Sequence, residues 1–233
     1  MNISVSPNNP THDSKYYQNA VHLGGICRRI SQRARVKNYH HFAKTMRPDE
    51  KTEILDLGTC DELSFEANML QQMHPHPGRI TCSSIGSGEA ILAAYPGVRH
   101  VRIAPGERLP FADRQFEIAY SNAVLEHTGT AESQRAFVVE MCRVSRRAYL
   151  MVPNRWFPVE HHTCMPLLHW LPQPWFRAIL RRTGFAFYAR EENLNQVSAT
   201  QILEWFPADR RPRIARTGIG VGWFRSNLVA FEP

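Results

Sequence analysis

From Lys51 onward, short apolar segments alternate with segments of helical periodicity, and this alternation constrains the fold more than any other feature. The apolar segments span residues 53–57, 79–85, 98–104, 116–121 and 148–152. Between them, apolar side chains recur at helical spacing, as at Phe65, Met69 and Met73 and again at Phe137, Met141 and Val144. Strands that alternate with helices form βαβ units around a mostly parallel sheet. The sequence therefore predicts a doubly wound α/β fold.

The regions on either side of this pattern differ from it in composition. Residues 1–50 are polar and basic and predict a flexible tip followed by a helix. After Pro153 the chain is rich in proline, aromatic residues and histidine. Prolines recur at positions 153, 158, 166, 172 and 174, and each removes a backbone donor and interrupts a helix. We therefore expect residues 155–212 to form an irregular cap over the sheet.

Local signals predict how the cap and the tail end. Ser198 and Gln201 have the spacing of a capping box that opens a short helix, and Pro207 ends that helix. Glycines 218, 220 and 222 divide the tail, which predicts a closing β-hairpin over residues 213–233. The expected organisation is an N-terminal segment, 1–50, and one domain, 51–233, whose core spans 51–154.

Composition indicates an ordinary soluble protein. With 233 residues, 43% of them hydrophobic, the chain can bury a core of its own. No apolar run has the length of a signal peptide or of a membrane span. The five cysteines are scattered without a CxxC pair, which argues against a disulfide framework or a cysteine zinc cluster. We expect a cytoplasmic protein.

The formal charge of +7 leaves a nucleic-acid partner open, because basic surfaces attract polyanions. The excess lies in two arginine-rich runs, around residues 28–37 and 177–213. Apolar residues at helical spacing interrupt both runs, which favours solvated helix faces. No RNA-binding module or base-flipping signature accompanies the charge, so the sequence argues against a nucleic-acid partner.

The segment ILDLG, residues 54–58, is the most informative loop. Ligands of open α/β sheets lie beyond the carboxyl ends of the strands, where Asp56 and Gly58 would stand. The phosphate-binding pattern GxGxxG is absent after Gly58. Thr59 and Glu62 instead have capping-box spacing, which predicts a helix beginning at Thr59. A ligand without phosphates fits this loop better than a dinucleotide.

ILDLG, the later segment ERLPFADRQFEIAYSNAVLEH and the strand end VPN occur in an order that resembles the bacterial class I S-adenosylmethionine-dependent methyltransferases, often labelled type 11. The likeness covers nearly all the chain after the N-terminal tip. It implies a Rossmann-like three-layer sandwich, S-adenosylmethionine as the cofactor, and methyl transfer. Because the cofactor carries an already activated methyl group, such a fold mainly supplies alignment.

The resemblance also implies roles for individual residues. Asp56, Gly58 and Thr59 would lie against the methionine part of the cofactor and Ser84 against its ribose. Gly106 and Glu107 would form the adenine turn, and Asn122 would line the sulfonium and acceptor side. This sequence departs from the family pattern at Cys60 and Glu62, where glycine is usual, at Ser84, where an acidic residue is usual, and at Pro105. These departures leave open a catalytically silent relative that only binds a partner.

An acceptor hydroxyl needs a general base within hydrogen-bond reach. His127, Glu160, His161 and His162 are the candidates, and we take His127 and His162 as the catalytic pair. His161, His162, Cys164 and His169 carry zinc-type ligand atoms, but adjacent histidines rarely converge on one tetrahedral ion. The sequence therefore predicts no metal site.

The acceptor itself stays open among a small molecule, a sugar and a lipid-linked intermediate. The cap contains tryptophans and phenylalanines beside arginines and prolines, as at Trp156 and Trp175. Such residues usually pack, but they also suit an amphiphilic acceptor or a peripheral membrane contact. The oligomeric state is not readable from the sequence.

Overall fold

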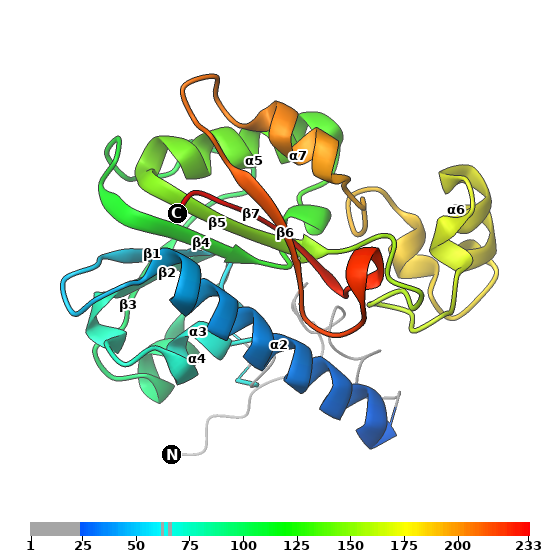
Figure 1. Ribbon diagram of the computed structural model, residues 1–233, viewed down its shortest axis with the longest axis horizontal. Coiled ribbons are helices and arrows are strands. Elements are labelled where there is room, and N and C mark those ends of the chain that lie inside the picture. Colours follow the sequence, from blue (N-terminus) through cyan, green and yellow to red (C-terminus); the bar gives the residue numbers. More distant parts are fainter. Residues whose placement is uncertain (1–23, 62, 65–66) are drawn as a thin grey trace, which may run out of the picture.

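The computed structural model describes residues 24–61, 63–64 and 67–233. Its centre is a seven-stranded sheet in the order β3-β2-β1-β4-β5-β7-β6 (Figure 1). The strands are β1 (Ile54–Leu57), β2 (Ile80–Ser84), β3 (Arg99–Arg102), β4 (Phe116–Asn122), β5 (Ser145–Pro153), β6 (Arg213–Thr217) and β7 (Asn227–Phe231). Strands β1 to β5 pair in parallel, whereas β7 is antiparallel to both β5 and β6. The predicted doubly wound sheet and its closing hairpin are confirmed.

The five predicted strands all form, with ends shifted by at most three residues. β1 is buried along its whole length, as expected for a central parallel strand covered on both faces. Its successive side chains alternate between the two cores of the molecule: Leu55 and Leu57 point to one face and Ile54 to the other.

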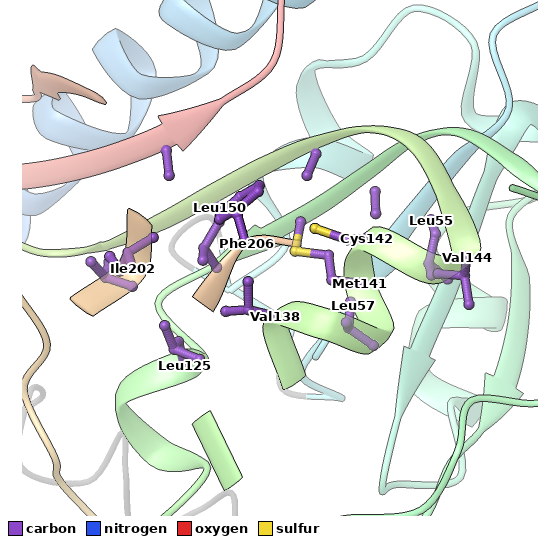
Figure 2. Close-up of a cluster of buried hydrophobic side chains, with 14 of the residues drawn as sticks. Leu55, Leu57, Leu125, Val138, Met141, Cys142, Val144, Leu150, Ile202 and Phe206 are labelled. Atoms are coloured by element: carbon purple, nitrogen blue, oxygen red, sulfur yellow. The ribbon is translucent and has the colours of Figure 1, made fainter. Parts of the chain in front are cut away.

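Helices cover both faces of the sheet (Figure 1). On one face lie α5 (Ala131–Val144) and α7 (Ala199–Trp205), and Figure 2 shows Val138 and Met141 of α5 packed with Ile202 of α7. On the other face lie α2 (Gly24–Met46), α3 (Met69–Met73) and α4 (Glu89–Ala94). The predicted three-layer sandwich is therefore present.

The segment after β5 forms the cap, which projects beyond one end of the sheet around α6 (Figure 1). It contains α6 (Gln173–Arg181) and two short 3-10 helices, η3 (Leu168–Trp170) and η4 (Ala186–Ala189). Phe176, Leu180 and Tyr188 form a small core of its own. The predicted capping box is observed: the Ser198 hydroxyl accepts from the Gln201 N–H at the start of α7, and the Gln201 side chain reaches back.

Three further 3-10 helices complete the described elements: η1 (Pro77–Arg79), η2 (Leu125–His127) and η5 (Gly222–Phe224). No helix in the described part of the chain is both long and apolar enough to cross a membrane. The expected N-terminal tip falls on residues 1–23, which lie outside the described residues.

The prediction of a helix beginning at Thr59 is wrong. The described residues between Thr59 and Ser64 are not helical, and α3 begins only at Met69. The Thr59 hydroxyl donates back to the Asp56 carbonyl (3.1 Å) instead of capping a helix. The Asn68 side-chain amide ties the two ends of this loop together, because it donates to the Cys60 carbonyl (3.0 Å) and accepts from the Ser64 N–H (3.2 Å). Glu62, Phe65 and Glu66 lie outside the described residues.

Candidate active site

The loop after β1 turns sharply at Gly58. Its φ of +92° is a conformation that side chains disfavour, and a Cβ there would lie 2.5 Å from both methyl carbons of Val124. The N–H groups of Gly58 and Thr59 both donate to the Ser83 carbonyl, at 2.8 and 3.1 Å. Val124 follows β4, so this turn brings the carboxyl ends of β1, β2 and β4 together.

Asp56 lies at this edge, but its side chain is buried. One carboxylate oxygen accepts a hydrogen bond from the Gln71 amide of α3 (2.5 Å). Burial raises the pKa of Asp56 to about 6, and hydrogen bonds from Gln71 and Thr59 oppose that rise. The buried Asp56 side chain therefore stabilises the loop through its hydrogen bond with Gln71 of α3.

Ser84, at the end of β2, has a neighbour that sequence reasoning missed. Its hydroxyl is hydrogen-bonded to the His100 ring (2.9 Å), and the Asp61 carboxylate accepts from the Gly88 N–H (3.0 Å). A Cβ at Gly86 would contact Asp61 and lie 3.6 Å from the Ser84 hydroxyl oxygen, so both side chains border the same small space. The second oxygen of Asp61 is buried and has no hydrogen-bond partner. The one sequence signal for Asp61 was its place between Cys60 and Glu62, the two positions of this loop where glycine is usual.

The expected adenine turn lies beside this space. The Ile103 N–H donates to the Ser84 carbonyl (2.8 Å), which ties the end of β3 to the end of β2. The following turn has Gly106 at φ +76° and Glu107 hydrogen-bonded to the Ala104 carbonyl (3.3 Å). Gly106 and Glu107 are both exposed. Asn122 ends β4 on the opposite side of the first loop and is half-buried.

Two histidines and two glutamates meet beyond β4, and we call Glu126, His127, Glu160 and His162 the histidine cluster. Glu126 and His127 belong to η2, whereas Glu160 and His162 come from the cap. The Nε2 atoms of His127 and His162 are 3.1 Å apart. The His127 Nε2 lies 3.9 Å from the nearer Glu126 oxygen. The structure thus brings together both predicted catalytic residues.

Each imidazole is oriented through its other nitrogen. The Nδ1 of His127 lies 2.6 Å from the Asn193 carbonyl oxygen, and the Nδ1 of His162 lies 2.9 Å from a Glu160 oxygen. A carbonyl and a carboxylate only accept, so each Nδ1 carries the proton and donates it. In the neutral rings, each Nε2 then presents a lone pair to the other.

The two glutamates have opposite electrostatic environments. Burial would raise the pKa of Glu160, but the charge of His162 and hydrogen bonds from His162 and Thr163 outweigh it and lower the pKa to about 2. Glu126 is 1% exposed, and both its oxygens lack a hydrogen-bond partner. Burial raises its pKa to about 7, against the opposing charge of His162. For His162, burial lowers the pKa, yet Glu160 outweighs this and the net pKa is raised.

Of the four cap residues considered as metal ligands, only His162 belongs to the histidine cluster. His161 is exposed and packs against the Phe157 ring, and the buried His169 ring bonds the Phe157 carbonyl (2.9 Å). The Cys164 N–H donates to the Glu160 carbonyl (2.8 Å). Sequence reasoning named His127 and His162 together as general-base candidates and expected the run Leu125-Glu126-His127 on the acceptor side, but it gave Glu126 no role of its own.

Comparison with known proteins agrees with this layout. Residues 55–150 match a family model described as a methyltransferase domain. No curated protein matches the chain in sequence.

Several solved structures share the fold. A methyltransferase of Thermotoga maritima that depends on S-adenosylmethionine superposes with a TM-score of 0.60 at 10% identity, covering 94% of this chain and 97% of that one. A chain from the complex of the Haloferax volcanii Trm112 methyltransferase activator with a methyltransferase superposes with a TM-score of 0.55 at 14% identity. The match covers 93% of this chain and 95% of that one. A TehB-like methyltransferase of Corynebacterium glutamicum superposes with a TM-score of 0.51 at 14% identity. The match covers 96% of this chain and 98% of that one.

Proposed function

Because residues 55–150 match a methyltransferase domain and the fold is that of S-adenosylmethionine-dependent methyltransferases, we propose that the chain methylates a small-molecule, sugar or lipid-linked acceptor held beside the histidine cluster. The observation that carries this proposal is the position of the cluster. It follows β4 directly, and Val124, two residues before Glu126, packs on the Gly58 turn. Ionisable side chains therefore stand next to the loop expected to hold the cofactor.

The residues at the β1 and β2 ends fit S-adenosylmethionine. A Cβ at Gly58 would clash with Val124, so this position must be glycine, and the backbone turns there without a side chain. Beside Ser84, the unpartnered Asp61 oxygen offers an acceptor for hydroxyl groups, and a carboxylate binds them more strongly than a serine hydroxyl does. We assign the methionine part to the loop at Asp56, Gly58 and Thr59, the ribose to Ser84 and Asp61, and the adenine to Gly106 and Glu107. When bound, the cofactor supplies a methyl group activated on a sulfonium.

On the acceptor side, the chain's own residues take up the proton that a hydroxyl or amine loses. Glu160 holds the His162 ring, and the Asn193 carbonyl holds the His127 ring, so both Nε2 atoms face the cluster. Glu126, with a raised pKa, adds a carboxyl that can exchange a proton near neutrality. Asn122 borders the same edge of the sheet and would line the path between cofactor and acceptor.

Exposed aromatic side chains favour an amphiphilic acceptor. Rings of the cap and of η5 form a chain of contacts, from Trp156 to Trp170 (centroids 6.2 Å apart) and from Trp170 to Phe224 (6.0 Å). Trp223, beside Phe224, is 65% exposed and stacks with Arg216. Apolar rings flanked by arginines suit a lipid-linked molecule or a membrane surface.

Calorimetric titration with S-adenosylmethionine and with its demethylated product tests the proposal. We expect micromolar binding of both, followed by transfer of labelled methyl groups to an acceptor in an organic or aqueous cell extract. The phase into which the labelled product partitions separates lipid-linked from polar acceptors. Absence of any heat of binding would leave the chain a silent relative and overturn the enzyme proposal.

A further inference from the structure

We propose that Glu126, His127 and His162 bind a divalent transition metal ion of the zinc type. Within the part of the chain that the structure describes, these residues form a group whose ligand atoms all lie within 4.8 Å of one another. Two imidazole nitrogens and one carboxylate are an established ligand set for catalytic zinc and for non-haem iron. The inference departs from the sequence-based expectation of no metal.

The distance between the two histidines suits a shared ion. Metal–nitrogen bonds of about 2.0–2.1 Å at a tetrahedral angle place two ligand nitrogens about 3.3 Å apart. The Nε2 atoms of His127 and His162 are 3.1 Å apart, and their rings are nearly perpendicular, at 89°. Since both Nδ1 atoms donate to oxygen acceptors, the facing Nε2 lone pairs repel unless a cation or a proton lies between them.

The surroundings are those of a metal site. Histidine ligands usually donate their other N–H to a carboxylate or a backbone carbonyl, which fixes the ring. His162 donates to the Glu160 carboxylate and His127 to the Asn193 carbonyl. Glu160 is itself held by the N–H groups of His162 (2.8 Å) and Thr163 (2.7 Å). The groups that orient the two imidazole rings therefore come from two separate segments of the chain, at Glu160 and at Asn193.

Glu126 provides an independent observation. Its side chain is 1% exposed, and neither carboxylate oxygen has a hydrogen-bond partner. A buried carboxylate without partners is costly, and ion coordination is one of the few ways to satisfy it. Glu126 and Glu160 bring two carboxylates to the cluster, and the positive charge of Arg35 of α2 acts on Glu126. A bound divalent cation would stabilise the ionised form of both carboxylates.

The ligand types select the kind of ion. Magnesium and calcium prefer sets of oxygen ligands, whereas imidazole suits zinc, iron, cobalt and nickel. Three protein ligands leave a coordination position open. If the proposed function holds, an acceptor hydroxyl can occupy that position and lose its proton to solvent more readily, with His127 and His162 acting as ligands and not as proton acceptors. Metal binding itself follows from the cluster geometry and does not depend on the cofactor.

The test uses the full-length chain without a histidine tag, treated with EDTA and then titrated with Co²⁺ and Zn²⁺. We expect one ion per chain, a visible Co²⁺ absorption band, and loss of that band when Zn²⁺ displaces cobalt. His127→Ala, His162→Ala and Glu126→Gln should each weaken Co²⁺ binding at least tenfold. Glu160→Gln, which alters only the second layer, should weaken it about tenfold to a hundredfold. The exposed neighbour His161→Ala is the matched control and should bind as the parent does.

Binding of less than one ion per chain, or an equal loss in His161→Ala, would overturn the proposal and leave a proton between the two rings. Circular dichroism of each variant shows whether it folds, and the parent titration decides the question even if the variants do not. Calorimetry with S-adenosylmethionine on the EDTA-treated protein is read separately. A protein that binds cobalt but no cofactor refutes the proposed function and not the metal site.

Discussion

The two sides of the sheet's carboxyl edge differ in how their buried polar groups are satisfied. On the β1–β2 side, Asp56 is hydrogen-bonded to Gln71 and the Ser84 hydroxyl to His100, and Asp61 has one partnered oxygen and one without a partner. On the β4 side, Glu126 is more deeply buried and neither of its oxygens has a hydrogen-bond partner, and His127 and His162 face each other. An unsatisfied buried polar group costs about 1–3 kcal/mol. Such a cost persists more readily at a site of chemistry than in a scaffold. We infer that the conformation of the backbone determines binding on the cofactor side, whereas ionisable side chains determine it on the acceptor side. Variants can test this difference.

The largest effect is expected from Gly58→Ala on the cofactor side. A left-handed alanine costs about 1–2 kcal/mol, and overpacking against Val124 adds about 1–3 kcal/mol. We expect a fall of several hundredfold in affinity for S-adenosylmethionine, the equivalent of about 3.5 kcal/mol. Calorimetry measures the affinity, and Gly58→Leu should abolish binding altogether.

Gly222→Ala is the matched control. Gly222 also has a positive φ, +55°, but nothing lies within 4 Å of the position of its Cβ. It should lose some stability and keep its affinity for the cofactor. Adding Val124→Ala to Gly58→Ala removes the two clashing methyl groups and should recover part of the loss. If Gly58→Ala binds the cofactor normally, backbone shape does not govern this side.

The next effect concerns Asp56, whose pKa is raised to about 6 by burial. The folded state holds this proton more tightly than the unfolded chain, whose carboxyl titrates near 3.8. Stability is therefore lost as pH rises from about 4 to about 6. The charge at higher pH costs about 3 kcal/mol, because each tenfold change in proton affinity corresponds to about 1.4 kcal/mol.

Asp56→Asn removes that charge and keeps an oxygen for Gln71. Its free energy of unfolding should exceed that of the parent by up to about 3 kcal/mol at pH 7.5, and the two proteins should converge near pH 4. Urea titrations at both pH values measure this difference. Equal stabilities at pH 7.5 would mean that the Asp56 carboxylate is fully satisfied, which would sharpen the contrast with Glu126.

Local signals allowed most of the fold to be predicted. Apolar runs such as that of β1, the Ser198 capping box and the glycine-divided hairpin depend on residues close together in the chain. The helix predicted at Thr59 was wrong because the Thr59 N–H donates to the Ser83 carbonyl of β2 and the Thr59 hydroxyl donates to the Asp56 carbonyl, which hold this segment as a loop.

The site was only partly predictable, for the same reason. Asp56 and Gly58 could be found because one short loop carries them. Glu126 could not be paired with His162, because α5 and β5 lie between them in the chain and His162 belongs to the irregular cap. The path of the cap depends on its own small core around Phe176 and Tyr188, which no periodicity in the sequence reveals. Asp61 was missed because its role depends on the close approach of the loop at Gly86.

The smallest of the three effects tests the acceptor side directly. His162→Ala and Trp156→Ala should each lower kcat/KM for the acceptor by on the order of tenfold, or about 1.4 kcal/mol of transition-state stabilisation. His162 lies in the cluster, and Trp156, 47% exposed, lies at the edge of the aromatic chain of contacts. Neither residue belongs to the loop at Gly58, so affinity for S-adenosylmethionine should change little. Parallel calorimetry and turnover assays separate the two quantities. Loss of cofactor binding in proportion to activity, in variants that remain folded, would place the cap in the cofactor pocket and remove the distinction between the two sides. Full activity in both variants would show that the cap only packs, and the acceptor would then have to be sought nearer to Asn122.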